Sequence, residues 1–169
     1  MAKEKSIYNG RLFHLVTRRA RLPHGRKVQL EIVRHPGAAL IVPFLAKDSV
    51  IILRQLRPVI SKYLYELPAG TIDKGESALS CARREVIEET GYAAKKFTRL
   101  GMIYPVPGYS TEKISIYKAE HLIKRQKDLD DDEVLVTKVV TRSLIRRLFK
   151  TGKIIDAKTI CAFALCGWL

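Results

Sequence analysis

Residues 70–92 read GTIDKGESALSCARREVIEETGY, and this stretch decides more about the protein than any other part of the chain. Glu85, Glu88 and Glu89 are three and four residues apart, so they are neighbours on a helix surface. Like charges at this spacing repel and weaken an isolated helix, and a cation reverses that effect. Clustered carboxylate oxygens suit a hard ion such as Mg²⁺, which binds through one or two carboxylates together with substrate phosphates.

The same stretch predicts a helix over residues 76–90. Apolar side chains recur at Leu79, Ala82 and Val86 and form the stripe that a helix buries. Gly91 suits a helix end, because glycine adopts the left-handed conformation found there.

Helical geometry separates the three glutamates. At about 100° per residue, Glu85 and Glu89 fall about 40° apart beside the apolar stripe, and Glu88 falls further toward solvent. We therefore expect Glu85 and Glu89 to face a cleft. For such a cluster taken alone, the alternative is a solvated acidic helix face with Arg84 as its ion-pair partner.

The spacing G-x5-E-x7-R-E-V-x-E-E-x-G, from Gly70 to Gly91, resembles the Nudix box at every specified position. Tyr92 is a looser match to the apolar residue that follows. The resemblance implies an α/β fold, the Nudix-like α/β/α sandwich around a mixed sheet. It also implies divalent metal ions, Mg²⁺ first and Mn²⁺ as the alternative, held by Glu85, Glu89 and, directly or through water, Glu88. In other boxes, the arginine that corresponds to Arg84 orients the glutamates.

Four further segments resemble the ADP-ribose pyrophosphatase branch of this family. They are RQLRP (54–58), ELPAG (66–70), PVPGYSTEK (105–113) and GKIIDAKTI (152–160). The branch implies hydrolysis of ADP-ribose or a related nucleoside diphosphate sugar to a nucleoside monophosphate and a sugar phosphate. Val106 stands where the branch usually has serine, so the preferred base and sugar stay open.

These segments supply the remaining site residues that we predict. The family implies a metal contact from the carbonyl of Ala69. Arginine binds phosphate in bidentate fashion, and carboxylates accept hydrogen bonds from sugar hydroxyls. The predicted substrate-binding residues are Arg54, Arg57, Glu66, Gly108 and Glu112. Either arginine alone is equally typical of an exposed or ion-paired strand end.

The acidic run at residues 130–133, DDDE, is the predicted source of the catalytic base. In similar pyrophosphatases a loop at this place swings a carboxylate over the metals. Glu133 is the first choice as base and metal ligand, and Asp131 is the second. The alternative is a solvated acidic turn.

Composition is that of a single globular unit with a short extension. The 169 residues are 47% hydrophobic and carry a net charge of +14. No stretch approaches the roughly 20 apolar residues of a membrane span. Three cysteines without zinc-like spacing favour reduced thiols and a cytoplasmic protein.

Strand patterns divide the chain into an N-terminal extension, residues 1–34, and a hydrolase domain, residues 35–169. The extension is predicted to be a β-hairpin that helps to form a homodimer, as is common in the resembled branch. The expected strands are 11–21, 27–34, 37–46, 50–56, 96–104, 113–121 and 134–141. Beyond the helix at 76–90, helices are expected at 143–150 and 157–168.

Two other functions stay open. The charge of +14 is compatible with an RNA 5′-end pyrophosphohydrolase, although the PVPGYSTEK segment disfavours that substrate. A non-catalytic Nudix-type module that binds nucleotide or RNA is disfavoured because every glutamate of the box is present.

Overall fold

The computed structural model describes residues 4–126 and 134–169. In chain order the strands and helices are β1 Glu4–Asn9, β2 His14–Arg21, β3 Lys27–Arg34, β4 Ala38–Ala46, β5 Ser49–Arg57, the short 3₁₀ helix η1 Pro58–Ile60, β6 Lys62–Glu66, β7 Ala69–Thr71, α1 Ala78–Thr90, β8 Tyr92–Ile103, β9 Ile114–Lys124, β10 Leu135–Thr141, α2 Arg142–Lys150 and α3 Ala157–Leu165.

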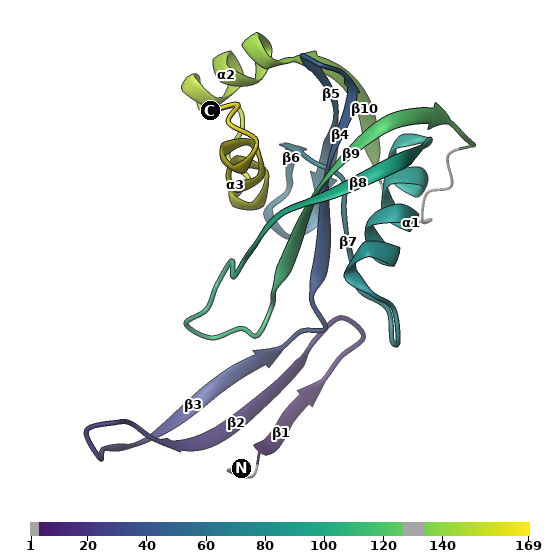
Figure 1. Ribbon diagram of the computed structural model, residues 1–169. Helices are drawn as coiled ribbons and strands as arrows, with labels where there is room; N and C mark the ends of the chain where they lie inside the picture. Colours follow the sequence, from purple (N-terminus) through teal and green to yellow (C-terminus); the bar gives the residue numbers. More distant parts are fainter. Residues whose placement is uncertain (1–3, 127–133) are drawn as a thin grey trace.

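The central sheet has the strand order β10-β5-β4-β9-β8. The β4–β9 pair is parallel and the other pairs are antiparallel, which makes the sheet mixed, as expected. Helix α1 covers one face, and α2 and α3 lie on the other (Figure 1). The predicted α/β/α sandwich is confirmed.

In the middle of this sheet, β4 and β5 are separated, and the ELPAG segment (66–70) lies between them. Strands β4 and β5 pair at their hairpin end, through Phe44 with Val50. Farther along, β6 pairs with β5 and β7 pairs with β4. The segment from β6 to β7 therefore crosses between the two central strands, beneath the helices of both faces.

Alternation along β4 builds two separate cores. Leu40 and Val42 pack in the cluster that includes α3, whereas Ala39 and Ile41 pack against α1. Successive side chains of a strand point to opposite faces, so one apolar run serves both layers. All four side chains are fully buried.

The N-terminal extension is larger than the predicted hairpin. Strands β2 and β3 form the expected hairpin, and β1 pairs with β2 to make a three-stranded sheet that projects from the main body (Figure 1). Strand β1 was not predicted, because its side chains are all exposed and leave no apolar alternation. Backbone bonds from Val33 to Tyr109 and Thr111 join β3 to the 105–113 loop.

Several predicted boundaries also shift. Helix α1 begins at Ala78, because Ser77 caps it by accepting a hydrogen bond from the Ser80 amide. Strand β8 begins at Tyr92 instead of residue 96, directly after Gly91 ends the helix at φ 74°. Helix α3 ends at Leu165 and is followed by a turn. In the described ranges, no helix is long and apolar enough to cross a membrane.

Candidate active site

Strand β7 and helix α1 meet at Gly70 and Glu85. The Glu85 carboxylate lies so close that a Cβ on Gly70 would fall 1.7 Å from Glu85 Oε1. The opening glycine of the box therefore leaves the space in which a glutamate 15 residues later rests against the backbone of the loop.

Glu89 is anchored to the same strand. Its Oε2 atom accepts a hydrogen bond from the Ala69 amide at 2.8 Å, and its side chain is only 2% exposed. Glu88 is partly exposed. The division that helical geometry predicted, with Glu85 and Glu89 inward and Glu88 outward, matches this burial.

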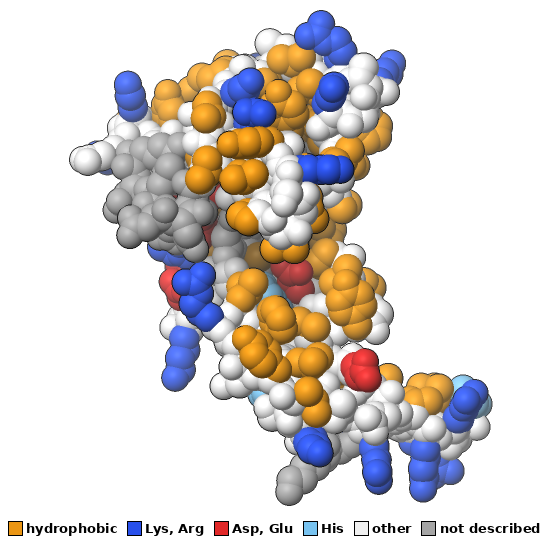
Figure 2. Space-filling model, turned by 180° about the vertical axis from the view of Figure 1, so that it is seen from behind, with side chains coloured by type: hydrophobic (Ala, Val, Ile, Leu, Met, Phe, Trp, Pro, Cys, Tyr) orange, Lys and Arg blue, Asp and Glu red, His pale blue; other side chains and the backbone are white. Residues whose placement is uncertain are grey.

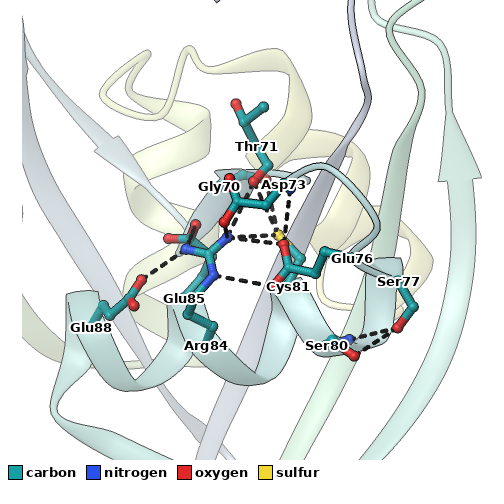
Figure 3. A network of polar contacts seen from close by, with 10 residues as sticks. All are labelled: Gly70, Thr71, Asp73, Glu76, Ser77, Ser80, Cys81, Arg84, Glu85 and Glu88. Carbon is teal, nitrogen blue, oxygen red and sulfur yellow. Dashed lines mark hydrogen bonds and ion pairs between the residues drawn. The ribbon is translucent and has the colours of Figure 1, made fainter.

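Arg84 organises the acidic cluster of the box (Figure 3). Its guanidinium donates to Glu85 Oε1 at 2.6 Å, to Glu88 Oε2 at 2.9 Å and to both carboxylate oxygens of Glu76. It also donates to the Thr71 carbonyl oxygen. Hydrogen bonding to Glu76 and the charges around it raise the pKa of Arg84, so this side chain is a permanent cation.

The network sets the protonation of its neighbours. The Arg84 hydrogen bond holds the pKa of Glu76 below its usual value. Burial, together with the nearby glutamates, raises the pKa of the Cys81 thiol to about 12. Cys81 is therefore a neutral thiol that contacts the Gly70 carbonyl, and it packs the helix against β7.

The donor set of the box fits a hard divalent ion. Glu85, Glu88 and Glu89 supply carboxylate oxygens, and Ala69 lies beside Glu89. Among the described residues, however, no three acidic, histidine or cysteine side chains are grouped as metal ligands. Glu85 and Glu88 are instead bound to Arg84, so an ion held by either carboxylate must compete with that guanidinium.

A cleft of about 370 Å³ lies beside β7. Seen from behind, acidic side chains lie at the narrow waist between the main body and the N-terminal sheet (Figure 2). The cleft brings together residues from distant parts of the chain, and its polar lining includes His35, Arg57, Glu112, Asp156 and Lys158. Ala69, Gly70 and Thr71 form the wall that separates the cleft from the box helix.

Arg57 is held in the cleft by Glu66. Its Nε and Nη2 atoms donate to the two carboxylate oxygens at 2.8 and 2.6 Å. Lys158 Nζ also donates to Glu66. Burial pushes the pKa of Glu66 upward, but hydrogen bonds and charge from Arg57 and Lys158 outweigh it and leave the pKa below its usual value.

Other predicted site residues lie elsewhere. Arg54 is exposed, with its guanidinium 4.1 Å from the centre of the Tyr63 ring. Gly108 lies in an exposed turn. Neither Arg54 nor Gly108 is among the described residues that line the cleft. Asp131 and Glu133 lie outside the described residues.

Sequence reasoning missed much of the cleft lining, including Leu12, His35, Asp156 and Lys158. Leu12 comes from the N-terminal extension and has no local signal. Asp156 and Lys158 both belong to the GKIIDAKTI segment. That segment's resemblance was the one clue to its place at the site.

Comparisons with known proteins point to one family. The profile described as "NUDIX domain" matches residues 33–163. The "ADP-ribose pyrophosphatase" of Bacillus subtilis (strain 168) is 35% identical over 164 residues, covering 96% of this chain and 88% of that protein. The "GDP-mannose pyrophosphatase" of Shigella flexneri serotype 5b (strain 8401) is 30% identical over 148 residues, covering 77% and 76%.

A solved structure shares the fold. The chain titled "Crystal structure of ADP compounds hydrolase" superimposes with a TM-score of 0.83 at 24% identity, over 97% of this chain and 89% of that one. The predicted family resemblance is confirmed. Since the family profile spans most of the chain and includes the whole glutamate box, the protein belongs to the NUDIX domain family.

Proposed function

We propose that the protein is a Nudix pyrophosphohydrolase that cleaves the pyrophosphate bond of ADP-ribose or a related nucleoside diphosphate sugar. The products are a nucleoside monophosphate and a sugar phosphate. One observation carries the proposal. The box glutamates Glu85 and Glu89 touch Gly70 and Ala69, and these two residues also form a wall of the cleft that contains Arg57.

Nudix hydrolases generally use divalent metal ions. For this protein we propose Mg²⁺, with Mn²⁺ as a substitute, bound by Glu85, Glu88, Glu89 and the Ala69 carbonyl. When bound, such an ion neutralises phosphate charge and lowers the pKa of a water molecule. Arg84 orients the glutamates, since its guanidinium already contacts two of them.

The cleft residues bind and orient the substrate. Arg57 is a cation at the cleft, and its pKa is raised chiefly by the hydrogen bonds to Glu66. We propose that it binds a phosphate of the substrate, where fixed positive charge stabilises developing negative charge. Glu112 accepts a hydrogen bond from a sugar hydroxyl. For Arg54 and Gly108, which do not line this cleft, a substrate contact is proposed from the family resemblance alone.

Glu66 is proposed to act through Arg57 more than by direct contact. It was expected to accept hydrogen bonds from the sugar, but it is 1% exposed and both of its oxygens bind cations. For the base we propose Glu133 first and Asp131 second, by resemblance to related pyrophosphatases.

We also propose the oligomeric state, the domain division and the cellular compartment of the protein. We infer a homodimer in which residues 1–34 form an extension that contacts the partner, with residues 35–169 as the hydrolase domain. The three cysteines are free thiols, which supports a reducing compartment such as the cytoplasm.

Hydrolysis of a substrate panel tests the function. The protein is incubated with ADP-ribose, GDP-mannose and 5′-triphosphate RNA in Mg²⁺, and the products are separated by chromatography. We expect AMP and ribose 5-phosphate from ADP-ribose, and none of either in chelator. Preferred cleavage of the RNA would instead support the 5′-end alternative, and nucleotide binding without release would support the non-catalytic module.

A further inference from the structure

The first turn of α3 forms hydrogen bonds with residues 66 and 67, which lead into the candidate active site. Asp156 caps the helix by accepting a hydrogen bond from the Thr159 amide at 3.0 Å. Two residues of that turn then reach back 92 positions along the chain: Lys158 Nζ donates to Glu66, and Thr159 Oγ1 accepts from the Leu67 amide at 2.9 Å. Asp156 also binds Lys158 Nζ at 2.8 Å and fixes its direction.

Lys158 makes charged contacts with Glu66 and Asp156, and Thr159 makes a buried neutral contact with Leu67. Glu66, Leu67 and Thr159 are each 1% exposed. A buried donor without its acceptor, or a buried carboxylate without its cations, is strongly unfavourable. The lysine, the threonine and their partners therefore hold one arrangement of the Glu66–Leu67 backbone.

Residues 66 and 67 lead directly to Pro68 and Ala69, on the side of the cleft next to the box helix. The Pro68 carbonyl accepts from the Ile41 amide at 2.8 Å, and the Ala69 amide donates to Glu89. Residues 66–69 are thus held by α3 at one end and by β4 and α1 at the other. A shift of the Leu67 backbone would therefore also move Ala69 and Glu89.

We propose that Lys158 and Thr159 are positioning residues for the hydrolysis, with Thr159 setting the place of Ala69 and Lys158 setting the charge around Arg57. This inference rests on the proposed function. Two cations, Arg57 and Lys158, balance the carboxylates of Glu66 and Asp156 at the cleft. Loss of the lysine charge leaves this cluster net negative, which repels an anionic substrate.

Two substitutions separate the two roles. Thr159→Val keeps the shape of the side chain and removes the acceptor for the Leu67 amide. We expect it to lower kcat by roughly 10- to 100-fold with little change in KM, because small displacements of reacting groups cost that much. Lys158→Met is expected to raise KM by roughly 10-fold. Thr159→Ser retains the hydroxyl and should restore the wild-type kcat.

Matched controls use exposed positions. Lys153→Met makes the same charge change on the surface, and Thr98→Val makes the same isosteric change on an exposed strand position. Neither should alter kcat or KM. Amide hydrogen exchange, followed by NMR at Leu67 and Ala69, reports the position of the segment without any catalysis. We expect faster exchange at both amides in Thr159→Val and wild-type exchange in Thr159→Ser.

The outcomes are distinct. Folded Thr159→Val and Lys158→Met proteins with wild-type kinetic constants and wild-type exchange would overturn the inference. Faster exchange without any kinetic change would also overturn it, since the contact would then be only structural. If the wild-type protein hydrolyses no nucleoside diphosphate sugar, the proposed function fails. Unchanged amide exchange in Thr159→Val would separately show that Thr159 does not hold Leu67 in place.

Discussion

Gly70 shows how one missing side chain shapes the site. Its backbone lies against the Glu85 carboxylate, where a methyl group would overlap the carboxylate oxygens. Gly70→Ala should therefore displace Glu85 and lower kcat by about 10²-fold, the scale expected when reacting groups are misplaced. The clash falls on a side-chain end, so the thermal unfolding temperature should change little. A folded variant with the wild-type rate would show that Glu85 needs no such contact.

Glu89 tests the metal assignment at the same scale. Glu89→Gln keeps an oxygen for the Ala69 amide and removes the negative charge. We expect nearly complete loss of metal-dependent hydrolysis in a folded protein, measured by nucleotide release. Glu89 is only 2% exposed, so the stability of the variant must be measured alongside its activity. Glu88→Gln should have the milder effect, and equal effects of the two would contradict the inward and outward roles.

The catalytic base is a prediction about Glu133. A general base typically contributes 10²- to 10⁴-fold. Glu133→Gln should therefore lower kcat by about 10²-fold or more, with a smaller change in KM, in steady-state assays. Asp131→Asn is the comparison and should have the weaker effect. If Asp131→Asn is the damaging change, the base lies two residues earlier, and if neither matters, Glu112 is the next candidate.

At the scale of elements, the Glu66 cluster joins β5, β6 and α3 through charge. The pKa of Glu66 is lowered in the folded protein because Arg57 and Lys158 outweigh burial. A lowered folded pKa means that the carboxylate stabilises the fold above its ordinary pKa of 4.5, and that this stability is lost as pH falls through the folded value.

Thermal unfolding of wild type and Glu66→Gln across the acid range tests this linkage. We expect the variant to unfold at a lower temperature near neutral pH, because Arg57 and Lys158 lose their shared partner. The difference from wild type should shrink as pH falls below about 4.5, the ordinary value for this group. A difference that stays constant with pH would show that Glu66 is stabilised by packing alone.

At the scale of the whole molecule, the N-terminal sheet leaves large apolar side chains exposed. Ile7 and Tyr8 of β1 and Leu12 and Phe13 of the loop that follows it are exposed, whereas Val16 is buried within the chain itself. Leu12 also lines the cleft. The rings of Tyr8 and Phe13 are 6.0 Å apart, and adjacent exposed apolar side chains are typical of a surface that another protein covers.

We predict a homodimer that uses this sheet. Light scattering at micromolar concentration should give twice the mass of the 19.2 kDa chain. Deletion of residues 1–34 should give a monomer and raise KM, because both the partner contact and the Leu12 wall are removed. A monomeric full-length protein would rule out this assembly.

The excess positive charge of the protein is spread over its surface. On the face shown in Figure 2, lysine and arginine side chains are distributed over the main body and the N-terminal sheet. A net charge of +14 arranged in this way attracts anions generally, which suits a nucleotide substrate without specifying one.

Local chemistry explains what could be predicted. The box helix, the inward direction of Glu85 and Glu89, and the strands β4, β5, β8, β9 and β10 of the central sheet follow from residue type and spacing within short windows. Strands β6 and β7 were missed because they pair with different partners on either side of an opening in the sheet. Strand β1 was missed because it buries none of its side chains.

The sequence by itself determined the family, the box helix and the set of carboxylates that can bind metal, because these depend on residues within about one helix and its entry loop. Tertiary structure alone decided that Arg57 shares Glu66 with Lys158 and that Thr159 holds Leu67, contacts that span 92 residues. It also decided that Leu12 reaches the cleft. The physical reason is that such pairs form only when sheet and helices pack, and no local propensity encodes which distant side chains then meet.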